Sequence, residues 1–141
     1  MTVQDKTVEV NGRTYRTPRQ PTAVICFDGC DPRYISHGLS SGLFPNISKV
    51  ISQGFYTIAD AAMPTFTNPN NMSIVAGAPP RVHGISGNYY LEKKTGKEVM
   101  ITDASLVSSG TVLAALADAG VQVAAITAKD KLRKMLGSGL K

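Results

Sequence analysis

Two short apolar runs constrain the fold of this chain more than any other feature of its sequence. "AVICF" (23–27) and "VQVAAIT" (121–127) are rich in β-branched residues, and each is followed by a predicted helix. Continuous apolar strands of this length are typical of parallel sheets covered on both faces. A third run, "FYTIADAAM" (55–63), follows a short amphipathic helix. This alternation predicts an α/β fold with a mostly parallel sheet and helices on both faces.

The helices are predicted from caps and from the spacing of apolar residues. Asp31-Pro32 is typical of an N-cap followed by proline at the first helical position. In "NNMSIVAG" (70–77), Met72, Val75 and Ala76 fall on one helical face, and Gly77 ends the pattern. The other helical patterns cover residues 45–54, 109–120 and 129–136.

Two β-hairpins are predicted from turn residues. "TVEVNGRTYR" (7–16) alternates about Asn11-Gly12, and "GNYYLEKKTGKEVMIT" (87–102) turns at Thr95-Gly96. A proline-rich linker follows the first hairpin. The chain therefore divides into a hairpin and linker at 1–20 and a main domain at 21–141.

Charge and composition narrow the class of ligand. The 141-residue chain has a net charge of +5 and a sequence pI near 9.4, with the excess in 91–99 and 128–141. The C-terminal lysines have no aromatic residues beside them, and the sequence contains no recognisable nucleic-acid module. Small anions are therefore favoured over polyanions as ligands.

No apolar run reaches the roughly 18 residues of a membrane span, and the polar N-terminus lacks a signal-peptide core. A cytoplasmic protein is expected, with one buried and one free thiol at Cys26 and Cys30, whose spacing does not match a zinc knuckle.

Polar clusters follow the predicted strands and give the main functional inference. Asp28 follows 23–27, the Thr65–Asn71 segment follows 55–63, and Lys129–Lys131 follows 121–127. Ligands of parallel sheets bind at the carboxyl ends of the strands. We therefore expect the three clusters to converge on one edge of the sheet.

Each cluster has a functional and a structural interpretation. Asp28 suits a divalent metal, but Asp-Gly is also a common turn pair. Thr67 near a helix N-terminus suits an anion site, and a metal-bound threonine is a nucleophile, although N-capping uses the same residue type. The polar excess in "TFTNPNN" favours a site. Lys129 and Lys131 lie at a helix N-terminus, where the helix dipole disfavours cations, and such a local conflict can mark an anion-binding site. A solvated basic face explains the same spacing equally well.

Residues of the segment "PPRVHGISGNYY" are also candidates. His83 is either a ligand or, with greater weight, a structural histidine that ties a loop. Asn88 either donates its amide to a phosphoryl oxygen or forms a turn after Gly87.

Taken in order, these motifs carry a family resemblance. "AVICFDGCDPRY" followed by "MPTFTNPNNMSIVAGAPPRVHGISGNYY" resembles the N-terminal half of the alkaline phosphatase superfamily, in its phosphodiesterase/nucleotide pyrophosphatase branch. That branch has a strand-end Asp, a Pro-Thr-x-Thr-x-Pro-Asn segment, an apolar helix ending in Gly, and a His-Gly followed by Asn. Within the branch, "TNPNNMSIV" and "ITAKDKLRKMLG" are most similar to the phosphonoacetate hydrolases.

The resemblance implies a partial alkaline-phosphatase-like core and a specific chemistry. Members use two zinc ions to hydrolyse phosphate esters or, in the phosphonoacetate hydrolases, the carbon–phosphorus bond of phosphonoacetate, which gives acetate and phosphate. By this resemblance Asp28 is a metal ligand, and Thr67 is both a metal ligand and the nucleophile. Asn88 then holds a phosphoryl oxygen, and Lys129 and Lys131 receive the substrate carboxylate.

The sequence departs from the superfamily in its metal ligands. The family's later Asp-x-x-x-His cluster, Asp-His pair and final His are not found, and two ligands are fewer than a catalytic zinc ion needs. The chain is therefore expected to be the N-terminal portion of a longer hydrolase and to have little activity alone. The alternatives are a nucleotide phosphodiesterase or pyrophosphatase of the same superfamily and a non-catalytic anion-binding domain.

Overall fold

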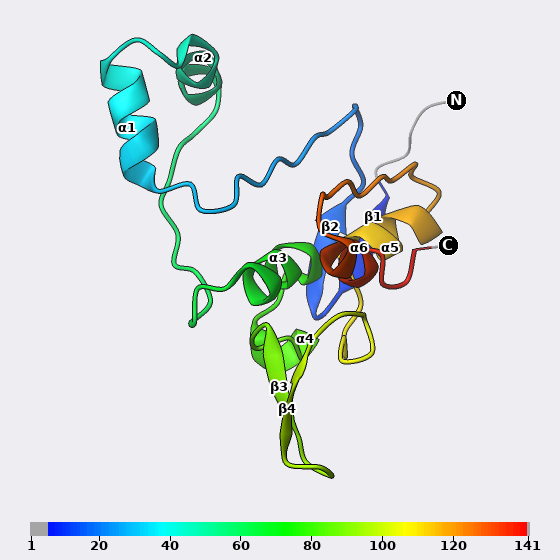
Figure 1. Cartoon of the computed structure of the whole chain (residues 1–141). Coiled ribbons are helices and arrows are strands. Elements are labelled where there is room, and N and C mark those ends of the chain that lie inside the picture. Colours follow the sequence, from blue (N-terminus) through cyan, green and yellow to red (C-terminus); the bar gives the residue numbers. More distant parts are fainter. Residues whose placement is uncertain (1–5, 141) are drawn as a thin grey trace. The chain divides into compact units, whose positions relative to one another are not determined.

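The computed structural model describes residues 6–140, which form six helices and two antiparallel hairpins (Figure 1). The chain divides into two compact units. One unit is Ala23–Asp60, and the other comprises the described residues up to Thr22 and from Ala61 onward. The elements, in chain order, are β1 (Thr7–Val10), β2 (Arg13–Arg16), α1 (Pro32–Ser40), α2 (Pro45–Gln53), α3 (Thr67–Ala76), α4 (Pro80–His83), β3 (Tyr89–Glu92), β4 (Lys97–Met100), α5 (Val112–Asp118) and α6 (Asp130–Leu136).

The mixed α/β composition is confirmed, but the predicted strands 23–27, 55–63 and 121–127 are not formed. Within residues 6–140 the only strand ladders are β1–β2 and β3–β4, both antiparallel, so no parallel sheet is present there. A strand needs a neighbour to hydrogen-bond its backbone, and these three runs have none in the described structure. Most apolar side chains of 23–27 and 55–63 are exposed as a result, and Phe27 is 71% exposed. In 121–127, Ile126 is 94% exposed, whereas Val121, Val123 and Ala125 are half-buried.

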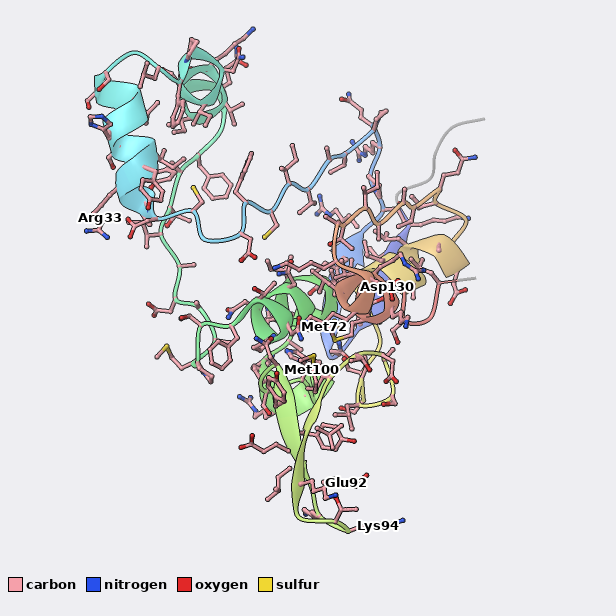
Figure 2. The ribbon with its side chains drawn as sticks, in the orientation of Figure 1. Arg33, Met72, Glu92, Lys94, Met100 and Asp130 are labelled. Atoms are coloured by element: carbon pink, nitrogen blue, oxygen red, sulfur yellow. The ribbon has the colours of Figure 1, made fainter. Side chains whose placement is uncertain are left out.

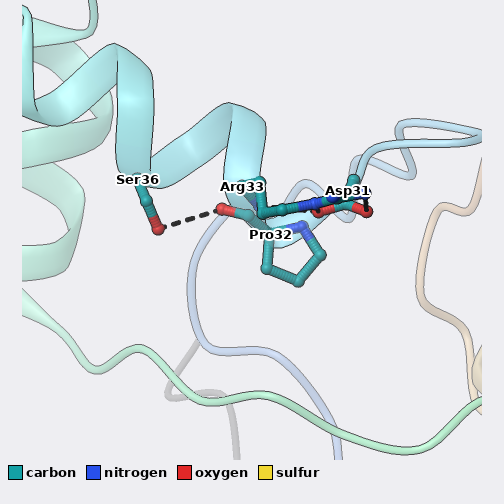
Figure 3. Close-up of polar contacts among 4 residues, drawn as sticks. All are labelled: Asp31, Pro32, Arg33 and Ser36. Atoms are coloured by element: carbon teal, nitrogen blue, oxygen red, sulfur yellow. Dashed lines mark hydrogen bonds and ion pairs between the residues drawn. The ribbon is translucent and has the colours of Figure 1, made fainter.

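The unit Ala23–Asp60 contains helices α1 and α2. As the Asp-Pro pair predicts, the Asp31 side chain caps α1 by accepting from the Arg33 backbone N–H at 2.8 Å (Figure 3). The Arg33 guanidinium also pairs with the same carboxylate at 2.9 Å, which lowers the pKa of Asp31 to about 2. The Phe44 ring lies directly against Gly38, where any Cβ would overlap it. Glycine at this position therefore lets the turn between the two helices close on α1.

In the larger unit, the first hairpin docks on the C-terminal end of α3. Asn11 and Gly12 form its turn with φ angles of 51° and 77°, as the Asn-Gly pair predicts. The Asn11 side-chain amide donates to the Ala76 carbonyl at 2.8 Å and to the Gly110 carbonyl at 3.0 Å. It thereby satisfies a carbonyl in the last turn of α3, which would otherwise lack a helical partner. The hairpin thus fixes one end of α3.

The core of this unit lies between α3, α6 and the base of the second hairpin. Its fully or nearly buried members come from distant parts of the sequence and include Met72 of α3, Ile85, Ile101 and three residues of α6 (Leu132, Met135 and Leu136). Val75 and Tyr90 pack against it. Figure 2 labels Met72 on α3 and Met100 at the base of β4, whereas Glu92 and Lys94 mark the far tip of that hairpin. Burial of Met72 and Ala76 confirms the helical face predicted for residues 70–77.

The structure also bears on the predictions made for the two cysteines and for membrane spans. Both Cys26 and Cys30 are exposed free thiols, so the expectation of one buried thiol is wrong: the run that contains Cys26 is not covered by a sheet. Among the described residues, no helix is both long and apolar enough to cross a membrane.

Candidate active site

Thr67 is the first residue of α3, which begins three positions before the helical pattern predicted for residues 70–77. The capping position is held by Phe66, whose side chain makes no capping hydrogen bond. In this respect α3 differs from α1 and α5, whose caps Asp31 and Thr111 accept from backbone N–H groups. The helix begins with Thr67 half-buried at its positive end, where a dipole favours an anion.

Two of the asparagines beside Thr67 have structural partners. The Asn70 side chain accepts from the Ala62 N–H at 2.8 Å and donates to the Ala62 carbonyl at 3.2 Å and the Phe66 carbonyl at 3.0 Å. The Asn71 side chain donates to the Thr67 carbonyl at 2.9 Å. These bonds account for part of the polar excess that the sequence suggested was functional. Asn68 differs, because it is 1% exposed and its Nδ2 has no hydrogen-bond partner in the described structure.

His83 has the contacts of a structural residue. It is fully buried, its Nδ1 accepts from the Ile85 N–H at 3.2 Å, and its Nε2 lies 3.0 Å from the Ser73 hydroxyl. Since Nδ1 accepts, the neutral ring carries its proton on Nε2 and donates to Ser73. Burial lowers the pKa of His83, which keeps the ring neutral. The residue ties the loop after α4 to α3, in agreement with the structural interpretation.

Asn88 lies at the base of the second hairpin. Its backbone carbonyl accepts from the Ile101 N–H at 2.9 Å, next to the core. Its side-chain Oδ1 is buried without a hydrogen-bond partner in the described structure. A buried acceptor without a partner is uncommon in native structures, so this oxygen marks an incompletely satisfied polar site beside the core.

Lys129 and Lys131 flank the start of α6. Lys129 is the capping residue, and Lys131 is half-buried in the first turn. The intervening Asp130 binds Arg133 at 2.6 Å and Lys134 at 3.3 Å, and the Arg133 contact is the main cause of its lowered pKa. The one acidic group of this turn is thus held by the cations of the last turn. Figure 2 marks Asp130 at this end of α6.

The same core positions three of the elements that carry the predicted residues. Thr67 is on α3 with Met72, Asn88 is bonded to Ile101, and Lys131 precedes Leu132. Met72, Ile101 and Leu132 belong to one buried cluster. The structure therefore builds these elements around a common support, within one compact unit.

Asp28 belongs to the other unit. It lies in a turn directly after 23–27, where the Cys30 N–H donates to the Phe27 carbonyl at 3.3 Å. Its convergence with the other clusters stays a prediction.

The donor set of the described residues does not form a complete zinc site. Asp28 and Thr67 offer two oxygen ligands, whereas a catalytic zinc ion has about three protein ligands. Within residues 6–140, no group of three or more His, Cys, Asp or Glu side chains is gathered closely enough to hold a metal.

The sequence pattern does not separate the structural role of Asn70 or the burial of Asn68 from the rest of the polar segment. The signal for Asn70 was available, because asparagine inside a helix tends to hydrogen-bond nearby backbone groups. The partner, Ala62, lies eight residues away across an irregular loop, and no periodic pattern reaches it. Burial of Asn68 followed from its position one helical turn from Met72.

Comparison with known proteins gives one family match over most of the chain. Residues 22–133 match the family described as type I phosphodiesterase / nucleotide pyrophosphatase. This range includes every candidate site residue considered above.

Two solved structures are similar over nearly the whole chain. They are phosphonoacetate hydrolase from Sinorhizobium meliloti 1021 in complex with phosphonoacetate and the same enzyme in complex with phosphonoformate. Each is 46% identical to this chain, with a TM-score of 0.91, and the match covers 98% of this chain and 33% of the solved chain. This chain therefore spans about a third of the length of these relatives.

Proposed function

We propose, from the chain's membership of the type I phosphodiesterase / nucleotide pyrophosphatase family, that it contributes the nucleophile and substrate-binding residues of a phosphonoacetate hydrolase. The reaction is hydrolysis of the carbon–phosphorus bond of phosphonoacetate to acetate and phosphate. The observation that carries the proposal is the 46% identity over 98% of this chain with an enzyme of that activity.

The two ligands of the solved relatives support the proposed substrate class. Phosphonoacetate and phosphonoformate both combine a phosphonate with a carboxylate, so a site for either needs two regions that favour anions. In this chain, the N-terminus of α3 is one such region and the lysines at the start of α6 are the other. We assign the phosphonate to Thr67 and Asn88 and the carboxylate to Lys129 and Lys131.

In the proposed reaction, the Thr67 hydroxyl releases its proton to solvent as its Oγ attacks phosphorus. A new O–P bond forms, the C–P bond breaks, and its electron pair leaves on the methylene carbon of acetate, which then takes a proton from water. The ammonium groups of Lys129 and Lys131 stabilise the negative charge that delocalises onto the carboxylate. Water next hydrolyses the phosphothreonine and releases phosphate, which restores Thr67.

Zinc is proposed as the cofactor from the family resemblance alone. Asp28 and Thr67 are its proposed ligands in this chain, and the remaining ligands have to come from groups other than those gathered in residues 6–140. We therefore expect the isolated 141-residue chain to turn over little or no phosphonoacetate when zinc is added. Measurable zinc-dependent release of phosphate by the purified chain would contradict this expectation.

We also propose that 23–27, 55–63 and 121–127 are strands of a mostly parallel sheet in the complete fold. The support comes from the first run: Val24 and Ile25 are adjacent, so they point to opposite faces of an extended chain, and they are 81% and 72% exposed. Apolar side chains on both faces are typical of a central parallel strand.

The test of the proposed function is a chimera in which this chain replaces the matched third of the Sinorhizobium meliloti enzyme. We expect the chimera to release acetate and phosphate in equal amounts from phosphonoacetate. Thr67→Ala is expected to abolish turnover, whereas Thr65→Ala, a matched change two residues earlier, is expected to keep most of it. A folded chimera that binds neither substrate nor zinc would contradict the proposal.

A nucleotide phosphodiesterase is the second candidate, because the family match carries that description. Lys129 and Lys131, at the start of α6, discriminate between the candidates. For a phosphonoacetate hydrolase, changing both Lys129 and Lys131 to alanine should reduce cleavage of phosphonoacetate far more than cleavage of an aryl phosphate ester. An equal loss on both substrates would favour the phosphodiesterase.

A further inference from the structure

We propose that Asn70 is a positioning residue that sets the direction of Thr67 by clamping the preceding loop to α3. This inference rests on the proposed function only for the role of Thr67, since the clamp itself is a feature of the fold. The observation behind the proposal is that the Asn70 side chain, within α3, is hydrogen-bonded to the backbone of Ala62 and Phe66.

The geometry of the clamp is unusually complete. The Asn70 amide uses its oxygen on the Ala62 N–H at 2.8 Å and its nitrogen on the Ala62 carbonyl at 3.2 Å, so it pairs with both polar backbone groups of one residue. This is the pattern by which a neighbouring strand would hold Ala62. The same nitrogen also donates to the Phe66 carbonyl at 3.0 Å, the last carbonyl before Thr67. One side chain therefore fixes both ends of the five-residue loop that delivers Thr67.

Apolar packing contributes little to the path of this loop. Within it, the Phe66 N–H donates to the Pro64 carbonyl at 2.8 Å, while Met63 is 82% exposed and Phe66 is 48% exposed. Apolar packing therefore does not hold these two side chains. Because Phe66 supplies no capping side chain, the first turn of α3 is not aligned by a conventional N-cap either.

The consequence concerns the helix entrance. A Ser, Thr, Asp or Asn cap places its side-chain oxygen on the N–H groups of the first turn, where an anion would otherwise bind. Asn70 fixes the entrance from inside the helix, through Ala62 and the Phe66 carbonyl, and places no oxygen there. Thr67 is thus oriented by a residue that does not compete with a bound phosphonate.

Asn71 is a matched control within the same helix. Its side chain has the same chemistry, but its Nδ2 donates to the Thr67 carbonyl at 2.9 Å, whereas Asn70 bonds to Ala62. Asn70→Ala removes the clamp and raises helix propensity, so the variant is expected to fold. Asn70→Asp is a second variant that keeps the acceptor for the Ala62 N–H and loses both donor bonds.

The test uses the full ¹⁵N-labelled chain. Amide hydrogen exchange reports the clamp at Ala62, residual dipolar coupling reports the direction of the Thr67 N–H, and phosphonoacetate titration reports binding. We expect Asn70→Ala to speed exchange at Ala62 about tenfold, to change the Thr67 coupling and to weaken phosphonoacetate binding about tenfold. Asn70→Asp should give intermediate exchange, and Asn71→Ala should match the wild type in exchange at Ala62.

Two results would overturn the proposal. Unchanged exchange at Ala62 in Asn70→Ala would show that no clamp exists. Faster exchange with an unchanged Thr67 coupling would show a structural role that does not reach Thr67. If the wild-type Thr67 amide does not respond to phosphonoacetate, binding of the phosphonate at Thr67 in the isolated chain is contradicted. The chimera then decides the proposed function, and exchange and coupling still decide the clamp.

Discussion

Replacing Gly77 by alanine is expected to separate the first hairpin from α3. Gly77 ends α3 with a φ of 59°, and a Cβ at this position would overlap the Tyr15 hydroxyl of β2. An L-residue in this left-handed region costs about 1 kcal/mol, and forcing a methyl group into occupied space costs about 1–3 kcal/mol. The free energy of unfolding should therefore fall by about 2–4 kcal/mol.

Gly96 provides a control for the backbone contribution. It has a similar φ of 67° in the turn of the second hairpin, and a Cβ there would meet no atom within 4 Å. Gly96→Ala should therefore cost only the conformational part, about 1 kcal/mol. The difference between the two variants isolates the overlap with Tyr15.

The assay is urea unfolding followed by far-ultraviolet circular dichroism. In a Tyr15→Phe background the hydroxyl is absent and the nearest ring carbon lies 3.0 Å from the added Cβ, so Gly77→Ala should cost less by about 1 kcal/mol. The reasoning is refuted if Gly77→Ala costs no more than Gly96→Ala. It is also refuted if removal of the Tyr15 hydroxyl leaves the cost unchanged.

Three further predictions use the polar contacts. Burial lowers the pKa of His83, so below the ordinary value of about 6.5 the unfolded state binds a proton that the folded state resists. The free energy of unfolding should therefore fall as pH falls through this region. Urea unfolding at a series of pH values should show this dependence in His37→Gln and not in His83→Gln. Asn11→Gly keeps the turn but removes two hydrogen bonds, at a cost of about 1–2 kcal/mol in urea unfolding; a cost near zero would contradict the docking. Arg33→Ala should raise the pKa of Asp31 from about 2 towards its ordinary value in an NMR titration, and an unchanged pKa would contradict the ion pair.

Local features of the fold were predictable because neighbouring residues determine them. The Asn11-Gly12 turn requires positive φ angles, which asparagine and glycine adopt most readily, and Asp31-Pro32 contains the cap and the first helical residue. The predicted strands 23–27 and 121–127 would depend instead on partner strands far away in the sequence, and within residues 6–140 they have none. A pattern can show that a segment suits a parallel sheet, but the sheet forms only where partner strands are present.

The candidate site was predictable to a similar extent. Placement of Thr67 at the entrance of a helix follows from the proline and the apolar spacing after it. The different contacts of the asparagines do not follow from the sequence pattern, since Asn70 and Asn71 differ only in which backbone groups their side chains reach. These contacts depend on the path of the loop from Ala62, which the sequence pattern leaves undefined.

The most direct test of the central proposal is detection of phosphothreonine at residue 67. The chimera described above would be mixed with phosphonoacetate, quenched in acid within the first turnover and digested for mass spectrometry. We predict a phosphate on the peptide that contains Thr67, and no modified peptide in Thr67→Ala. Steady release of phosphate without any phosphothreonine, or with the phosphate on another residue, would contradict the proposal that Thr67 is the nucleophile.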